Sequence, residues 1–474
     1  MNPEVRTLRR SISATQYFAV GFGSIVGVAW IIIMGDAVAS AGAVGTAFAL
    51  FIGALGILLV AFCYAEMAAR LPGAGGEIVY AQALGGSGTA YLTGWTLALV
   101  YTAACAFQAI SIGQLLGLLF PGIEGPVAYS ILGHEVRVGN LVIGGGLAIA
   151  LAALAMRGVR GAAVVQEWVT YLRIAMMAGF IAIAIAYADP ANLRPLVPGE
   201  TATLKFAAIL SMLGSAPFWF AGFNAAVTTA EECSTSMTAA GRALIFAILG
   251  SAAFYILLVL SVGALVPVAT LKTLPLPAAQ AFEIAMGTPT VAKIVLVTAI
   301  LGSVTAWNAL LLAGSRVYFA LGRAHLSPAA FARLNVQGAP SLAILAVTAA
   351  TLVALPLGRG FILPIINIIS ACFGIIYVAT CLAVLKMRKS GMQASFTAPG
   401  GTPLVVTAIV FSVIIALVAL FQPWFLSGGT VPPEWITLGC WAVVSLLVWF
   451  GAQARIKALP DEARLDLLKG ESRG

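Results

Sequence analysis

A chain of 474 residues in which 61% are hydrophobic and only 9% are charged lies far outside the composition of soluble globular domains. Its six cysteines include no CxxC pair and its two histidines, His134 and His325, lie in loops, which excludes a disulfide framework, a zinc site and a membrane hydrolase. We therefore expect no enzymatic activity, no catalytic residues, no metal and no cofactor.

Apolar runs of near 20 residues recur from end to end, each long enough to cross a hydrocarbon core of roughly 30 Å as a helix. The runs predict about twelve spans, at residues 16–36, 43–66, 91–120, 139–156, 163–187, 205–230, 243–267, 291–321, 341–357, 361–385, 403–421 and 436–453. They predict one transmembrane domain, 16–453, between an N-terminal tail, 1–15, and a C-terminal tail, 454–474.

The basic residues sort by side of the membrane. With both termini assigned to the cytoplasm, 18 of the 25 lysines and arginines lie inside, and Arg173 lies within a span. The six outside are Arg137, Arg194, Lys205, Lys272, Lys293 and Arg359. This bias follows the positive-inside rule, so the net charge of +8 predicts a multi-pass protein of the inner (plasma) membrane with cytoplasmic termini and no nucleic-acid partner.

The first span contains a glycine-rich stretch, Gly21–Trp30. Its GxGxxxG spacing does not fit a dinucleotide-binding loop, and no strand precedes it. Two interpretations stay open: Gly23 and Gly27 form a GxxxG packing face, or the helix unwinds there and its freed amides and carbonyls face a buried solute.

The sixth span carries a second interruption, Ser215–Asn224, in which Pro217 and Gly222 disfavour a continuous helix. Matching breaks in two halves of a chain indicate an inverted-repeat transporter with a site near the middle of the membrane. At such breaks, free amides suit a substrate carboxylate and free carbonyls suit its ammonium group.

Several motifs in order along the chain resemble the amino acid permease branch of the amino acid/polyamine/organocation (APC) superfamily. They are Gly23–Gly27, Tyr64–Tyr80, Ala221–Asn224 with Thr229–Glu232, and Asn308–Leu311 with Gly314–Arg316. The resemblance implies an all-α, leucine-transporter-type fold with two inverted five-helix repeats, about 16–187 and 205–385, and peripheral helices at about 403–453. It also implies secondary active transport by alternating access, most often of amino acids.

Residues beside the two breaks are the candidates for substrate binding. They are Gly23, Ser24, Ile25, Gly27, Val28, Ala29, Trp219, Phe220, Gly222, Phe223 and Asn224. Family members often have Gly-Ser-Gly where this chain has Gly27-Val28-Ala29, and Trp30 follows where a smaller or different apolar residue is usual. Backbone amides can still bind a carboxylate there, or the protein exchanges polyamines or organic amines without recognising a carboxylate.

Arg173 lies some ten residues into the fifth span. Either it faces the bundle interior or it extends to the cytoplasmic surface. By resemblance, it falls where many APC permeases carry a lysine in place of a sodium site, where it could donate to carbonyls of the broken first helix. This interpretation predicts transport without sodium, as exchange, facilitated uptake or proton-linked uptake.

The gating candidates are Phe223, as an outer lid, and Glu66, Arg70, Glu231 and Glu232 at cytoplasmic span ends. The carboxylates either are solvated or form an inner gate with Arg70, Arg157 or Arg160. A membrane nutrient sensor built like a transporter is the other class left open. The expected partners are a small amino acid or amine and the lipid bilayer; the sequence leaves the solute, the direction of flux and the oligomeric state open.

Overall fold

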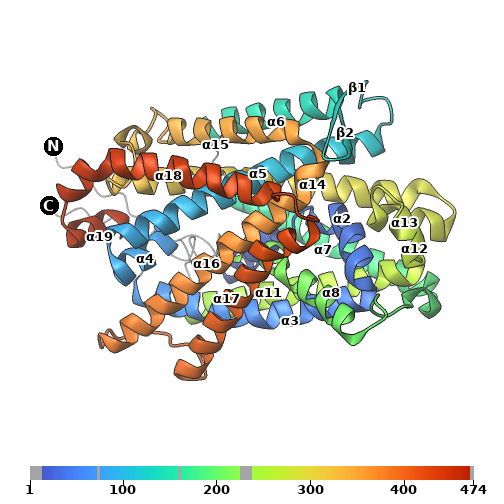
Figure 1. Ribbon diagram of the computed structural model, residues 1–474, viewed down its shortest axis with the longest axis horizontal. Coiled ribbons are helices and arrows are strands. Elements are labelled where there is room, and N and C mark those ends of the chain that lie inside the picture. The colour runs from blue at the N-terminus through green and yellow to red at the C-terminus, as the bar shows by residue number, and fades with distance from the viewer. Residues whose placement is uncertain (1–12, 72–74, 158–161, 225–236, 470–474) are drawn as a thin grey trace.

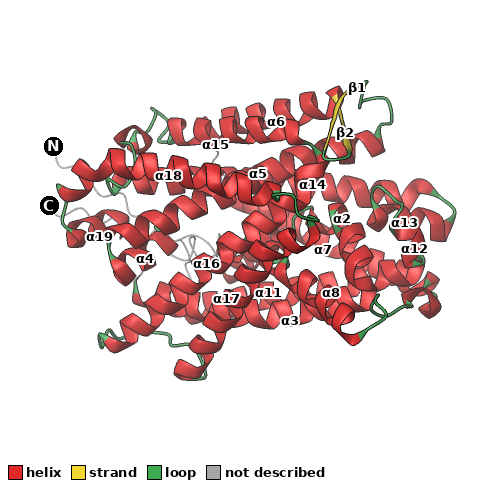
Figure 2. Cartoon of the chain, in the orientation of Figure 1, coloured by secondary structure: helices red, strands yellow, loops and turns green. Residues whose placement is uncertain are grey.

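The computed structural model describes residues 13–71, 75–157, 162–224 and 237–469. Within these residues the chain is helical apart from one hairpin, β1 (Val127–Ile131) and β2 (His134–Arg137) (Figure 2). The all-α prediction is confirmed, and the hairpin was not foreseen.

Most of the long helices overlap the predicted spans. The helices are α1 (Ala14–Ile25), α2 (Ala29–Ile32), α3 (Met34–Arg70), α4 (Glu77–Gly85), α5 (Ser87–Leu119), α6 (Val138–Met156), α7 (Ala162–Tyr187), α8 (Ala202–Gly214), α9 (Ala216–Trp219), α11 (Met237–Leu265), α12 (Val268–Leu271), α13 (Pro277–Met286), α14 (Pro289–Arg323), α15 (Ser341–Ala354), α16 (Ile362–Lys389), α17 (Gly401–Leu426), α18 (Pro433–Lys457) and α19 (Asp461–Lys469). Short 3₁₀ turns lie at Pro190–Leu193, Ala329–Ala332, Leu355–Leu357 and Arg359–Phe361. Helix α3 runs across the predicted gap between 36 and 43, and α4, α12, α13 and α19 lie outside the predicted spans.

Ten helical segments of the described chain are long and apolar enough to cross a membrane. The shorter apolar segment Ser341–Leu357 accounts for an eleventh predicted span. The span predicted at 205–230 is divided between α8 and α9, and its residues from 225 lie outside the described part of the chain. The chain is therefore an all-α, multi-pass membrane protein.

Burial separates the central helices from the peripheral ones. In α5, 89% of the most apolar stretch is buried, whereas in α18 the share is 6%. Helices α3, α14 and α16 pack on α5 or on one another, while α17 and α18 lie on the outside of α16 (Figure 1). Helices α4 and α19 lie at one end of the molecule, and the hairpin, α12 and α13 lie at the opposite end (Figure 1).

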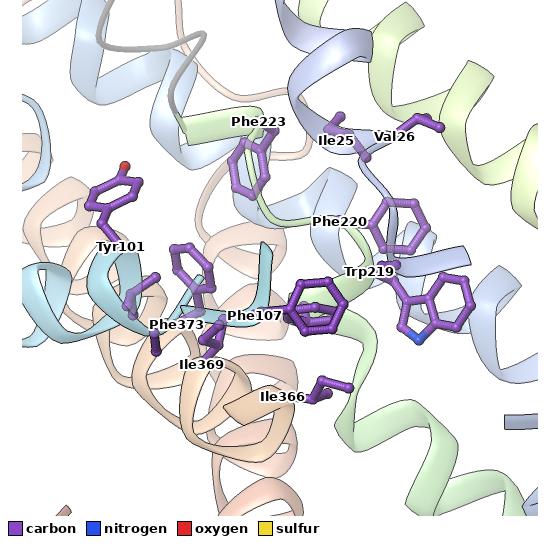
Figure 3. Packing of buried hydrophobic residues seen from close by; sticks show 14 of the residues in the cluster. Ile25, Val26, Tyr101, Phe107, Trp219, Phe220, Phe223, Ile366, Ile369 and Phe373 are labelled. Carbon is purple, nitrogen blue, oxygen red and sulfur yellow. The ribbon is translucent and has the colours of Figure 1, made fainter. Parts of the chain in front are cut away.

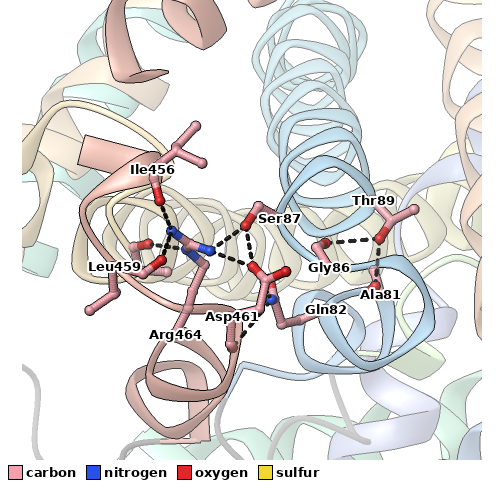
Figure 4. Close-up of polar contacts among 10 residues, drawn as sticks. Ala81, Gln82, Gly86, Ser87, Thr89, Ile456, Leu459, Asp461 and Arg464 are labelled. Carbon is pink, nitrogen blue, oxygen red and sulfur yellow. Dashed lines mark hydrogen bonds and ion pairs between the residues drawn. The ribbon is translucent and has the colours of Figure 1, made fainter. Parts of the chain in front are cut away.

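The C-terminal tail contains a helix that the sequence did not predict. Arg464 of α19 is 1% exposed; it forms an ion pair of 2.6 Å with Asp461 and donates to Ala324 O at 3.0 Å. Asp461 also accepts hydrogen bonds from Gln82 and Ser87 at 3.1 and 2.5 Å (Figure 4). The bond from Ser87 is the main cause that lowers the pKa of Asp461. These contacts fix α19 to α4 and to the ends of α5 and α14.

The first span breaks where the glycine-rich stretch predicts. Helix α1 ends at Ile25 and α2 starts at Ala29. Between them the Gly27 amide folds back to donate to Ile25 O at 2.9 Å, so the regular i to i−4 pattern stops. The interpretation of an unwound helix is confirmed, and the chain resumes as α2 and then α3.

The second break lies directly against the first. Helix α9 ends at Trp219, and Gly222 has φ +109°, a conformation that only glycine adopts without strain. A Cβ atom at Gly222 would lie 2.4 Å from Ser24 O. The two broken segments therefore touch backbone to backbone, and Gly222 permits this contact.

We expect Gly222→Ala to destabilise the protein. The new methyl group would collide with Ser24, and the backbone strain alone costs about 1–3 kcal/mol. The measurement is thermal unfolding of the purified variant in detergent. Gly146→Ala is the matched control, because a Cβ there would meet nothing within 4 Å. Equal stability of the two variants would contradict the close contact between the breaks.

Candidate functional site

A small cavity lies where the two breaks meet. Its volume is about 50 Å³. Its walls come from the α1–α2 connection, the segment after α9, and the helices α5, α14 and α16. Ligand pockets usually exceed ~300 Å³, and a single water takes up about 30 Å³. The structure therefore shows a contracted form, and a larger ligand requires the walls to move apart.

Six of the eleven substrate-binding candidates line this cavity: Ser24, Ile25, Gly27, Val28, Ala29 and Gly222. The other five, Gly23, Trp219, Phe220, Phe223 and Asn224, are not part of its lining in this conformation. Sequence reasoning missed the walls from other helices, which include Tyr101, Phe107, Gln108, Leu310, Ile369 and Phe373, and it missed Phe218 and Ala221 beside the second break. Only Gln108, a polar residue in the middle of an apolar span, carried a signal.

The polar groups at the cavity are mostly backbone groups of the first break. Within the described residues, the amides of Val28 and Ala29 donate no hydrogen bond. The side chain of Gln108 accepts from Ser303 Oγ at 2.8 Å, and its Nε2 lies beside the first break, 3.7 Å from where a Cβ of Gly27 would be. These donors can meet an anionic group, while the described side chains that line the cavity carry no charge.

The aromatic residues of the second break form a layer behind the cavity. Trp219 and Phe220 lie side by side (Figure 3). Both pack on Tyr255 of α11, with their ring centroids 5.1 and 6.0 Å from that of the tyrosine. The Tyr255 hydroxyl donates to Ile25 O at 2.9 Å. Trp219 and Phe220 therefore pack against Tyr255, the side chain whose hydroxyl donates to the first break. Trp30 also lies in the packed core, edge-on to Phe254 at 5.8 Å.

Phe223 lies on the side of the break that faces α4. It is fully buried, with its ring 5.3 Å from Tyr64 and 5.7 Å from Tyr377. Tyr64 lies near the end of α3 that leads into α4, the end opposite the hairpin. The role of Phe223 as an outer lid stays a prediction.

Arg173 faces the bundle interior. It is 2% exposed, which excludes the alternative in which it extends to the membrane surface. Its Nη2 donates to the carbonyl oxygens of Val26 and Gly27, both freed by the first break. On the other side it fills the space beside Gly302 of α14, where a Cβ would lie 2.7 Å from the guanidinium carbon. The predicted contact with the broken helix is confirmed, and a fixed positive charge occupies the gap between α1 and α14.

Glu66 is buried and ionically paired. Its carboxylate lies 2.7 Å from Arg70 and 2.5 Å from Arg388, and it accepts a hydrogen bond from the Ala398 amide at 2.9 Å. The alternative of a solvated helix end is therefore wrong for Glu66. The pairing with Arg70 was foreseen, whereas Arg388 at the end of α16 was not. Of the other gating candidates, Arg157 is exposed, and Arg160, Glu231 and Glu232 lie outside the described residues.

Asn224 turns away from the cavity. Its Nδ2 donates to the Glu77 carboxyl group at 3.1 Å. Both side chains are buried, at 1% and 3% exposure. Glu77 lies within the motif Tyr64–Tyr80, but no feature of that motif distinguishes it from an ordinary loop charge.

Comparisons with known proteins agree with this architecture. The family model described as amino acid permease matches residues 12–447. The methylthioribose transporter of Bacillus subtilis (strain 168) is 26% identical over 94% of this chain and 94% of its own length. The branched-chain amino acid permease BcaP of the same organism is 26% identical over 89% of this chain and 92% of its own. The vacuolar cationic amino acid transporter 2 of Arabidopsis thaliana is 25% identical over 84% of this chain and 61% of its own.

The matched region runs from the start of the first broken helix to the last spanning helix, and it includes both breaks and every described wall of the cavity. The chain belongs to the amino acid permease family, and it is a transporter rather than an enzyme.

Proposed function

We propose that the protein carries a neutral amino acid with an apolar side chain across the cell membrane, by alternating access and without sodium. The cavity between the two breaks is the observation that carries this proposal. Backbone amides at Val28 and Ala29 suit a carboxylate, and the walls formed by Phe107, Ile369 and Phe373 suit an aliphatic side chain.

The composition of the cavity also separates this substrate class from the alternatives. The described lining contains no carboxylate, so a second positive charge on a polyamine or a cationic amino acid would be buried without a counter-ion. The relatives are named for methylthioribose, branched-chain amino acids and cationic amino acids, at similar identities. The identities do not distinguish these three substrates, whereas the apolar lining of the cavity favours branched-chain amino acids.

The orientation in this proposal has α4 and α19 in the cytoplasm and the hairpin outside. The predicted charge bias supports it, because Arg388, Arg464 and Lys469 lie at the end of the molecule with α4, opposite the hairpin. The two repeats and the short tails predicted from the sequence belong to the same proposal.

Purified protein in liposomes loaded with unlabelled L-leucine should take up external radiolabelled L-leucine by exchange, with saturation. Unlabelled L-isoleucine should compete, whereas L-lysine and methylthioribose should not, because the described walls offer neither a counter-ion nor enough hydrogen-bonding groups. Liposomes without protein are the control. No exchange of leucine would favour the sensor class, and competition by lysine alone would favour the amine exchanger.

We expect Gly27→Ala to weaken binding while leaving the fold intact. Its Cβ would meet Gln108 and Ala306 at 3.7 and 3.9 Å, which are ordinary contacts, so yield and melting temperature should stay near wild type. The methyl group would project among the residues that line the cavity. Loss of one polar contact to the ligand, about 1–3 kcal/mol, corresponds to about 5- to 150-fold weaker affinity. The measurement is leucine-induced thermal shift, with Gly146→Ala as control; unchanged affinity would remove Gly27 from the site.

Transport should not depend on sodium. The guanidinium of Arg173 already supplies the positive charge between α1 and α14 and donates to the carbonyls of Val26 and Gly27. Replacing sodium chloride by potassium chloride on both sides should leave the initial rate of exchange within about twofold, because a second cation there would meet a fixed positive charge. Strict dependence on sodium would rule out this role of Arg173.

A further inference from the structure

Glu77 is a buried carboxyl group without a cationic partner among the described residues. It is the first residue of α4, which is not one of the spanning helices, and it is 3% exposed. Three tyrosines from three different helices lie within electrostatic range of it: Tyr64 of α3, Tyr101 of α5 and Tyr377 of α16. Phenols are uncharged near neutral pH, so the described surroundings offer Glu77 no compensating charge.

The contrast with Glu66 shows what this chain provides for an ionised carboxylate. Glu66 has two arginines and a backbone amide around it. Glu77 has only neutral donors around it, which are Asn224 Nδ2, its own backbone amide and the Tyr64 hydroxyl, and it forms no ion pair with the described residues. An isolated charge in such a place is strongly unfavourable, and a buried carboxyl group instead takes up a proton.

The partner of Glu77 has a free acceptor. Asn224 is 1% exposed, and its Oδ1 is buried without a hydrogen-bond donor among the described residues. A protonated carboxyl group has one O–H to donate, whereas a carboxylate has none. A proton on Glu77 would complete a two-bond pair, with Asn224 Nδ2 donating to the carboxyl and the carboxyl donating to Asn224 Oδ1.

The pair joins two elements on which access to the cavity depends. Glu77 begins α4, and Asn224 follows Gly222, which lines the cavity at the second break. Tyr101 lines the cavity and lies within electrostatic range of Glu77, so the carboxyl group is close to the solute space.

We propose that Glu77 is a proton-binding site that couples proton entry to solute transport, through its pairing with Asn224. In each cycle the carboxylate takes one proton from water on the outer side and gives it to water on the inner side. Protonation holds α4 against the second broken helix and keeps the cytoplasmic side closed. Opening to the cytoplasm lets water reach Glu77, which ionises. This inference rests on the transport function proposed above and adds its driving ion.

The direction of the pH effect follows from burial. Burial raises the pKa of Glu77, and hydrogen bonds from its own backbone amide, from Asn224 and from Tyr64 oppose the rise only partly. In a form open to water the value returns toward about 4.3. Protonation therefore stabilises the closed form fully below that value, and the effect is lost as pH rises through the raised pKa.

The test uses wild-type protein in liposomes that contain a trapped pH-sensitive dye, with L-leucine as the probe. External leucine should acidify the interior, and an acid exterior should drive leucine accumulation. Glu77→Gln copies the protonated acid in shape and hydrogen bonding. Because it holds the cytoplasmic side closed at every pH, it should slow leucine exchange, make the remaining exchange independent of pH, and abolish acidification and accumulation.

Glu434→Gln is the matched control. Glu434 is also buried, at 5% exposure, and accepts from Asn367 Nδ2 at 2.8 Å, but it lies on peripheral α18. This variant should behave as wild type. Leucine exchange by wild type without acidification would overturn the inference alone, as would acidification that persists in Glu77→Gln. No leucine exchange by wild type would overturn the proposed function and the inference together. If Glu77→Gln fails to fold, the dye measurement on wild type still tests proton coupling, because leucine exchange without acidification would overturn it.

Discussion

Every backbone amide and carbonyl inside a membrane needs a hydrogen-bond partner, and the two broken helices violate that requirement at the centre of this protein. Side chains from other helices satisfy three of the freed carbonyls: Arg173 donates to Val26 and Gly27, and Tyr255 donates to Ile25. The amides of Val28 and Ala29 have no partner in the described residues. Ser24 O, at the cavity, likewise has no donor among the described residues, so the break offers both an acceptor and donors there.

These unpaired groups constrain what can bind. The guanidinium of Arg173 disfavours a metal cation beside Val26 and Gly27, whereas the unpaired amides at the cavity favour a carboxylate and Ser24 O can accept from an ammonium group. The apolar walls from α5, α14 and α16 then favour an uncharged remainder. A zwitterion with an aliphatic side chain meets both conditions.

The sequence predicted features that depend on local backbone chemistry or on charge within an apolar span. Both breaks follow from glycine and proline positions, and the interior contact of Arg173 follows from the cost of a charge in lipid. Contacts between distant segments could not be predicted. Arg388 reaches Glu66 across 322 residues, and α19 docks on α4 through Asp461 and Arg464, both in a tail that hydropathy classes as polar. The walls from α5 and α16 look like ordinary apolar helix in the sequence, and Glu77 looks like an ordinary loop charge.

The strengths of the contacts at the α4 end indicate where that end opens. The bridge from α3 to α16 at Glu66 is held by two arginines, and α19 ties α4 to α5 and α14 through the Asp461–Arg464 pair. Charge-assisted bonds of this kind are roughly twice as strong as neutral ones. The contact between Glu77 and Asn224 is neutral when the carboxyl group is protonated, and a single ionisation turns it into an unpaired buried charge. The contact between Glu77 of α4 and Asn224 of the second broken helix therefore forms when Glu77 takes up a proton and weakens when it loses one. The ionic contacts on either side would keep α4, α5, α14 and α19 together as one body while the broken helix moves away.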